Sequence, residues 1–124
     1  MTREDLLYTE DHEWIQVEDG VATIGVTHFA QDQLGDIVYV EIDNENAEAG
    51  EPMGSIEAVK TVSDIIAPLT GNIIEINDSL EDMPDQVNND PYGTGWIAKI
   101  SIDDESELET LLSPVEYKEI IGEE

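Results

Sequence analysis

Two short apolar runs that meet at Lys60 constrain the fold of this chain more than any other feature. The first run covers residues 53–59 and the second covers residues 62–68, and both are rich in β-branched residues and bounded by Gly or Pro. Runs of this length and composition predict strands. Because the connection between them is so short, the two strands must be antiparallel neighbours, with Lys60 exposed at the tip of a hairpin.

An exposed amine on this turn has two interpretations. The chain contains only four Lys and Arg residues, so a lysine kept on a turn is a candidate attachment point for a cofactor on a swinging arm. A solvated turn lysine with no special role would look the same. Lys60 alone leaves both interpretations open.

Further local signals predict a chain of short strands with a few helices. Asp19-Gly20 between two β-branched runs predicts a hairpin, and Thr27 and Gly35 are a suitable N-cap and C-terminal stop for a short helix. Ser106 and Ser113 are each followed three residues later by Glu, as in a capping box, so two C-terminal helices are expected. A further strand is predicted over residues 37–42.

An internal repeat organises these elements. Residues 35–43 are similar to residues 71–77, and each copy is followed by an acidic loop and a second strand, over residues 53–59 and 96–102. Two similar halves predict a quasi-two-fold β-sandwich in which each half contributes strands to both sheets. The hairpin with Lys60 would then join the halves at one end of the sandwich.

The charge of the chain excludes several kinds of partner. Four basic against 31 acidic residues give a net charge of −27. This charge repels nucleic acid and anionic lipid, so neither is an expected partner. The acids are spread along the chain rather than gathered in a tail, which we interpret as adaptation of an ordinary fold to a salt-rich, halophilic cytoplasm.

The remaining composition predicts one domain over residues 1–124 in the cytoplasm. At 124 residues the chain is long enough for one modest core. No run is apolar enough for a membrane span, and the first residues resemble neither a signal nor a transit peptide. Without cysteine, His12 and His28 cannot complete a thiolate metal site, so no metal is expected and the histidines are assigned to structural hydrogen bonds.

A set of short motifs, in order and at matching spacing, resembles the glycine cleavage H-protein family over about residues 8–117. The motifs are Tyr8-Thr9-x-x-His12-Glu13-Trp14, Leu34-Gly35-Asp36-Ile37-Val38, Gly54-x-Ile56-Glu57-x-Val59-Lys60, Ser63-Asp64-Ile65, Pro68-x-x-Gly71 and Asn89-Asp90-Pro91-Tyr92-Gly93-x-Gly95-Trp96. The resemblance implies a mainly β fold, the barrel-sandwich hybrid of lipoyl domains, also called the hammerhead fold. It also implies lipoic acid joined by an amide to Lys60.

Two other carriers share that fold. Biotin carriers favour Glu-Ala-Met-Lys-Met at the hairpin, and this chain has Glu-Ala-Val-Lys-Thr, which lacks both methionines. Lipoyl domains of 2-oxo acid dehydrogenase acyltransferases usually have Asp-Lys-Ala there and are tethered to a catalytic domain. The H-protein family more often has Glu-Ser-Val-Lys-Ala, so Ala58 and Thr61 depart from its pattern and leave the preference of the attaching enzyme open.

The resemblance implies a carrier subunit and not an enzyme. Such a subunit takes the aminomethyl group of glycine from a pyridoxal-phosphate glycine decarboxylase (P protein) to a tetrahydrofolate-dependent aminomethyltransferase (T protein). Dihydrolipoamide dehydrogenase (L protein) then reoxidises the dithiol, and a lipoate ligase or octanoyltransferase attaches the cofactor. An alternative role is an octanoyl or lipoyl relay in lipoate assembly, which needs the same lysine.

Residues other than Lys60 also occupy family motif positions. Glu57, Val59 and Asp64 are the expected recognition residues of the hairpin. Glu13 and Asp64 are candidates for a shallow cleft that holds the cationic amine at the end of the arm. The alternative is that these two are ordinary solvated acids.

Overall fold

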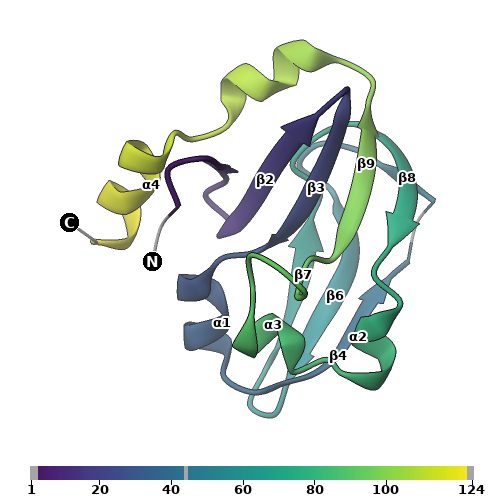
Figure 1. Cartoon of the computed structure of the whole chain (residues 1–124), viewed down its shortest axis with the longest axis vertical. Helices are drawn as coiled ribbons and strands as arrows, with labels where there is room; N and C mark the ends of the chain where they lie inside the picture. The colour runs from purple at the N-terminus through teal and green to yellow at the C-terminus, as the bar shows by residue number, and fades with distance from the viewer. Residues whose placement is uncertain (1–2, 44, 123–124) are drawn as a thin grey trace.

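The computed structural model describes residues 3–43 and 45–122 (Figure 1). The other residues of the predicted 1–124 domain, which are 1–2, 44 and 123–124, lie outside this description. The strands are β1 (Leu7–Tyr8), β2 (Glu13–Glu18), β3 (Val21–Val26), β4 (Ile37–Ile42), β5 (Asn46–Ala47), β6 (Pro52–Ala58), β7 (Val62–Ile66), β8 (Gly71–Ile76) and β9 (Ala98–Ile102). The helices are α1 (His28–Leu34), α2 (Ser79–Asp82), α3 (Gln86–Asn89), a 3₁₀ helix (Glu105–Thr110) and α4 (Pro114–Ile121).

The described strands form two sheets. One sheet has six strands in the order β1-β2-β3-β9-β8-β5, and the other has three in the order β4-β6-β7. Every pairing between neighbouring strands is antiparallel. The predicted β-sandwich is therefore confirmed, in the form of two unequal sheets accompanied by short helices.

The repeat predicted from the sequence is visible in the strand pairing. The first half of the chain places β4 and β6 in the three-stranded sheet and β5 in the six-stranded sheet. The second half places β7 in the three-stranded sheet and β8 and β9 in the six-stranded sheet. Each half thus contributes to both sheets, and the β6–β7 hairpin that joins the halves ends at the bottom of the view in Figure 1.

The main core is made by the inward side chains of the two sheets. Ile15, Ile24 and Ile100 come from the six-stranded sheet and Ile56 and Ile65 from the three-stranded sheet, and all are almost fully buried. Burying side chains of this size stabilises the fold by about 1.5–3 kcal/mol each. The position of the Lys60 hairpin is therefore fixed by a packed core beneath it.

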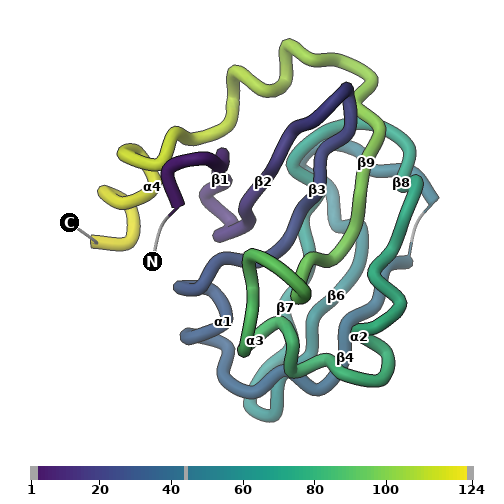
Figure 2. The backbone as a smooth tube through the Cα atoms, viewed as in Figure 1, coloured from purple at the N-terminus to yellow at the C-terminus, as the bar shows by residue number. Residues whose placement is uncertain are grey.

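A second, smaller core lies where the two ends of the described chain meet (Figure 2). It consists of Leu6, Tyr8, Trp14 and Tyr117, with Tyr8 and Tyr117 stacked at 4.5 Å between ring centroids. Backbone hydrogen bonds between Tyr8 and Leu112 tie the N-terminal segment to the residues before α4. The C-terminal helix thus packs against the start of the six-stranded sheet.

Two helix predictions are confirmed and one is wrong. Thr27 caps α1, and Ser113 and Glu116 form the predicted capping box of α4. The capping box predicted at Ser106 is absent from the described residues: the N–H and the hydroxyl of Ser106 both donate to Asp104 Oδ1, at 3.0 and 2.6 Å. Asp104 acts as the cap instead, and the segment that follows is the 3₁₀ helix. Among the described residues, no helix is both long and apolar enough to cross a membrane.

Candidate functional site

Lys60 lies on a two-residue turn that the backbone holds firmly. The Ala58 N–H donates to the Thr61 carbonyl at 2.8 Å, which closes the β6–β7 hairpin, and the Val59 N–H donates to Asp36 at 3.0 Å. Both turn residues are exposed, Val59 to 70%. The second hydrogen bond anchors the turn to the chain before β4, so the exposed lysine side chain starts from a fixed backbone.

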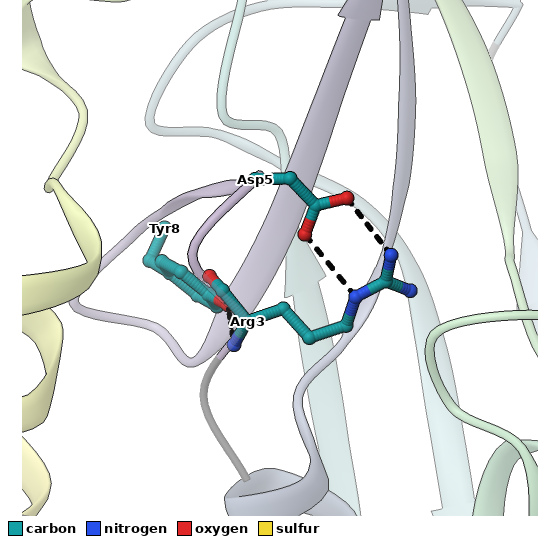
Figure 3. Close-up of polar contacts among 3 residues, drawn as sticks. All are labelled: Arg3, Asp5 and Tyr8. Carbon is teal, nitrogen blue, oxygen red and sulfur yellow. Dashed lines mark hydrogen bonds and ion pairs between the residues drawn. The ribbon is translucent and has the colours of Figure 1, made fainter.

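Lys60 differs from the other basic residues in its charge partners. Arg3 pairs with Asp5, Lys99 with Glu75 and Lys118 with Glu4, at 2.8, 3.7 and 2.8 Å; Figure 3 shows the first pair. Within residues 3–43 and 45–122, no acidic group forms an ion pair with Lys60. In a chain with 31 acids, this leaves the Lys60 amine available for chemistry.

The expected recognition residues surround this turn on the outer side of the hairpin. Glu57 on β6 is paired with Val62 on β7, and both are exposed. Asp64 is paired with Ser55 further along the hairpin and is exposed as well. Glu57 and Val59 therefore lie next to Lys60, whereas Asp64 lies further along β7.

A cavity of about 310 Å³ lies alongside β7. Glu13 and Asp64 both line it, from β2 and β7 respectively, so the structure brings together the two acids proposed for a cleft. The rest of the lining is Asp11, His12, Val26, Phe29, Ala30, Gln33, Leu34, Ile56, Ser63 and Ile65. Half of the apolar lining comes from α1, as Phe29, Ala30 and Leu34, and Thr27 caps this helix.

Glu13 is a buried carboxyl group at the base of this cavity. Only 3% of the residue is exposed. Its Oε2 accepts from the Ile66 N–H at 3.1 Å, and Oε1 accepts from the Thr9 hydroxyl at 3.4 Å. No described cationic side chain forms an ion pair with it.

The pKa of the Glu13 carboxyl group follows from its burial and its surroundings. Burial raises the pKa of the Glu13 carboxyl well above its ordinary value of 4.5, and the negative charge of Asp11 raises it further. The hydrogen bonds from Ile66 and Thr9 act in the opposite direction. A buried carboxylate without a counter-charge is costly, so Glu13 is well suited to receive a cationic ligand.

Sequence reasoning missed most of the cavity wall. His12, Phe29 and Gln33 line it although the first was assigned a structural role and the others none. Phe29 and Gln33 lie four residues apart on one face of the predicted helix, and this spacing was the available signal. For His12 the signal was its position immediately before Glu13.

A hydrogen-bonded β-hairpin with an exposed lysine that has no ion-pair partner among the described residues, together with a cleft that contains a buried acid, is the arrangement expected of a carrier domain. Comparison with known proteins gives the particular family. The sequence model described as Glycine cleavage H-protein matches residues 6–124. The chain therefore belongs to the glycine cleavage H-protein family.

Curated relatives and a crystal structure agree with this assignment. Glycine cleavage system H proteins of Staphylococcus carnosus and Listeria monocytogenes are 49% and 50% identical over 122 and 119 residues. These alignments cover 97% of both chains in the first case and 94% and 95% in the second. The crystal structure of an H protein from Mycobacterium marinum superposes with a TM-score of 0.87 at 38% identity, over 97% of this chain and 98% of that one. Like its family, the chain is a carrier component of the glycine cleavage system and not an enzyme.

Proposed function

We propose that Lys60 carries lipoic acid through an amide bond. The observation that carries this proposal is the exposed Lys60 amine, without an ion-pair partner among the described residues, on a turn fixed by two backbone hydrogen bonds. The group attached there would supply a disulfide that takes up the aminomethyl group of glycine, and it would be left on the lysine as a dithiol once that group has been passed on. Glu57 and Val59 would be read by the attaching enzyme, a lipoate ligase or an octanoyltransferase, with Asp64 at the edge of the same surface.

The cavity along β7 fits the distal end of such an arm. Asp64 is four residues beyond Lys60, or about 13 Å along a strand at about 3.3 Å per residue. A lysine extended by a lipoyl chain reaches about 14 Å, summed from ordinary bond lengths. Glu13 and Asp64 would bind the protonated amine of the cargo, and Phe29, Leu34 and Ile65 would exclude water from it.

The partners follow from this chemistry. The chain would deliver the aminomethyl group from a glycine decarboxylase (P protein) to a tetrahydrofolate-dependent aminomethyltransferase (T protein), and dihydrolipoamide dehydrogenase (L protein) would reoxidise the dithiol. A tethered group raises the effective concentration of the cargo at each active site. The carrier therefore contributes positioning and protection rather than catalysis.

The decisive experiment measures the intact mass of the chain isolated from its own cells during growth on glycine. We expect the mass of one lipoyl group, and peptide mapping should locate it on Lys60. A consistently unmodified lysine, or a biotinyl group, would refute the proposal. Protein overproduced in another host is not a substitute, because it can lack the modification.

Reconstitution separates glycine cleavage from a relay role in lipoate assembly. Lipoylated protein added to P and T proteins should support glycine–bicarbonate exchange and methylene transfer. If the protein instead donates its acyl group to other lipoyl domains and supports no exchange, the relay role is correct and the glycine cleavage role is wrong.

A further inference from the structure

Three side chains from distant parts of the chain form a hydrogen-bonded row beside the cavity. The Tyr117 hydroxyl of α4 lies 2.7 Å from Oγ1 of Thr27 and 3.0 Å from Nδ1 of His12. Tyr117 and Thr27 are fully buried. The row joins the C-terminal helix to Thr27, the cap of α1, and to His12, and both α1 and His12 line the cavity.

The protons in this row can be assigned by following the donors. Oγ1 of Thr27 accepts from the Ala30 N–H at 3.1 Å, and among the described residues its own proton has one acceptor, the Tyr117 oxygen. A buried hydroxyl proton without an acceptor is costly. Thr27 therefore donates to Tyr117, and the Tyr117 hydroxyl has its own proton to donate to Nδ1 of His12, 3.0 Å away.

This assignment fixes the tautomer of His12. A neutral imidazole that accepts at Nδ1 carries its proton on Nε2. Burial lowers the pKa of His12, against the opposing effect of the Asp11 charge, so the neutral ring is favoured. Nε2 has no hydrogen-bond partner among the described residues, and His12 lines the cavity.

The backbone of His12 is also held in an unusual conformation. Its φ of 65° lies in the left-handed region, which costs a residue with a side chain about 1–2 kcal/mol. Hydrogen bonds from the His12 N–H to Thr9 and from the Thr27 N–H to the His12 carbonyl, both 3.1 Å, maintain it. The Phe29 ring of α1, whose centroid lies 4.9 Å from that of the imidazole, restricts the movement of the imidazole on that side. Strain held in place in this way is a common sign of a functional position.

We propose that Tyr117 and Thr27 are positioning residues that hold His12 as an Nε2–H donor facing the cavity, where it binds a sulfur atom of the reduced arm. This inference rests on the proposed lipoylation of Lys60. It divides the cavity between two kinds of group: Glu13 and Asp64 bind the cationic amine, and His12 donates to the neighbouring thiol or thiolate. An ionised carboxylate has no proton to donate to a thiolate, whereas the Nε2–H of His12 does.

The chain offers a closely matched pair of variants for testing this. Tyr117→Phe removes the hydroxyl from the row and keeps the ring stacked on Tyr8. Tyr8→Phe removes the other hydroxyl of the same stack, whose partners among the described residues are the backbone N–H and carbonyl of Arg3 (Figure 3). Thr27→Ser, which keeps both the hydroxyl and the helix cap, is the conservative variant.

The first measurement uses the unmodified chain and does not depend on lipoylation. Two-bond ¹H–¹⁵N spectra should show His12 as the Nε2–H tautomer in the parent chain, in Tyr8→Phe and in Thr27→Ser. Tyr117→Phe should give a mixture of tautomers. A His12 protonated on Nδ1 in the parent chain, or a tautomer unaffected by Tyr117→Phe, would overturn the inference even if Lys60 proves to be lipoylated.

The second measurement uses lipoylated protein, reduced and then loaded with formaldehyde and ammonia. Loading should shift the His12 Nε2 resonance in the parent and in Tyr8→Phe. In Tyr117→Phe the shift should be lost and the cargo should be released roughly tenfold faster, as expected for one hydrogen bond to a charged group. If Nε2–H instead donates to Asp11, loading will leave the resonance unchanged, and the assignment of the sulfur to His12 is wrong.

Discussion

The β2–β3 and β6–β7 hairpins have the same topology and are held in different ways. The β2–β3 hairpin turns at Asp19 and Gly20, with φ values of 51° and 78°, as a type I′ turn requires. The β6–β7 hairpin turns at Val59 and Lys60, and neither residue has a positive φ. Val-Lys is not a usual hairpin dipeptide.

The two hairpins also differ in the neighbouring strands that support them. Both β2 and β3 have a neighbouring strand on each side, and the Gly20 carbonyl accepts from the Ile102 N–H at 2.9 Å. In contrast, β7 is an edge strand, and the Glu13 side chain binds the Ile66 N–H at its end. The first turn contains residues that suit its backbone, whereas the second does not and contains the lysine that we propose is lipoylated. A turn that departs from the usual stereochemical preferences is therefore a useful marker of function.

The largest contrast between the hairpins is expected from Lys60→Arg. This change keeps the charge and the exposed turn, so the melting temperature should stay the same, but arginine cannot form the amide and modification should fall to zero. Intact mass of the purified variant, produced with an active lipoate ligase, gives the measurement. Lys99→Arg is the control, since Lys99 already pairs with Glu75. Modification of Lys60→Arg at another lysine would show that the hairpin is not the site.

Added salt should stabilise both hairpins to the same extent. The net charge of −27 is spread over the whole chain, and at molar salt the Debye length falls to about 3 Å. Screening should stabilise the fold by about 3 kcal/mol between 0.1 M and 2 M KCl, which is roughly 10 °C in melting temperature. Thermal melts followed by circular dichroism would test this. A midpoint that does not change with salt would remove the halophilic interpretation.

Glu13→Gln should act on the β6–β7 hairpin, where the Glu13 side chain binds the Ile66 N–H, rather than on the β2–β3 turn. The raised pKa of Glu13 means that the native chain binds more protons than the unfolded chain at pH values between the two pKa values. Stability therefore falls as pH rises through that interval. The amide can still accept from Ile66 without a charge, so the variant should gain about 1–3 kcal/mol at pH 8 and lose this pH dependence, as measured by urea unfolding.

The same variant should be worse as a carrier. Without the buried carboxylate, the cargo amine loses its counter-charge, so loaded protein should decay faster than the parent by roughly tenfold. Asp64→Asn should have a smaller effect in the same direction, because Asp64 is exposed and its attraction is screened. If decay is unchanged in both variants, these acids are ordinary solvated or structural groups.

Gly20→Ala should have the opposite effects to Lys60→Arg, a loss of stability without a loss of lipoylation. A β-carbon at Gly20 meets no atom within 4 Å, so its cost comes only from the positive φ. We expect a loss of about 1–2 kcal/mol in the free energy of unfolding with lipoylation unaffected. Asp19→Asn, which tolerates the same conformation, is the control and should be nearly neutral. Impaired lipoylation in Gly20→Ala would show that the inner hairpin also supports the site.

Much of the fold could be predicted from the sequence because its signals are local. The Asp19-Gly20 turn, the Thr27 cap and the Ser113 capping box each depend on residues a few positions apart. The failure at Ser106 also has a local cause, since Asp104, two residues earlier, accepts from the Ser106 N–H and is itself the cap. The exposed position of Lys60 on a hairpin could be predicted for the same reason, as the hairpin is contiguous in the chain.

The cavity could be predicted only in part. Glu13 and Asp64 were chosen from family motifs, but the burial of one and the exposure of the other depend on how the sheets pack. The row of Thr27, Tyr117 and His12 joins residues 90 and 105 positions apart. No periodicity or spacing in the sequence reports such contacts, so His12 had been assigned only a structural role.

The smallest expected effect on stability is that of a substitution at Val59, whose exposed side chain has few contacts to lose. It is 70% exposed beside Lys60, so Val59→Thr, which keeps the shape and adds a hydroxyl, should change the free energy of unfolding by less than about 0.5 kcal/mol. The attaching enzyme must nevertheless cover this turn to reach the lysine, and burying the new hydroxyl against it without a partner costs about 1–3 kcal/mol. Lipoylation by the ligase should therefore become roughly tenfold slower.

Val115→Thr is the matched control for Val59→Thr, because Val115 is 60% exposed on α4, away from the lysine hairpin. Its lipoylation rate should equal that of the parent chain. If both variants are modified at the parent rate, the apolar side chain beside Lys60 is not read by the enzyme. The Lys60 turn would then differ from the Asp19-Gly20 turn only in its lysine and not in the surface around it.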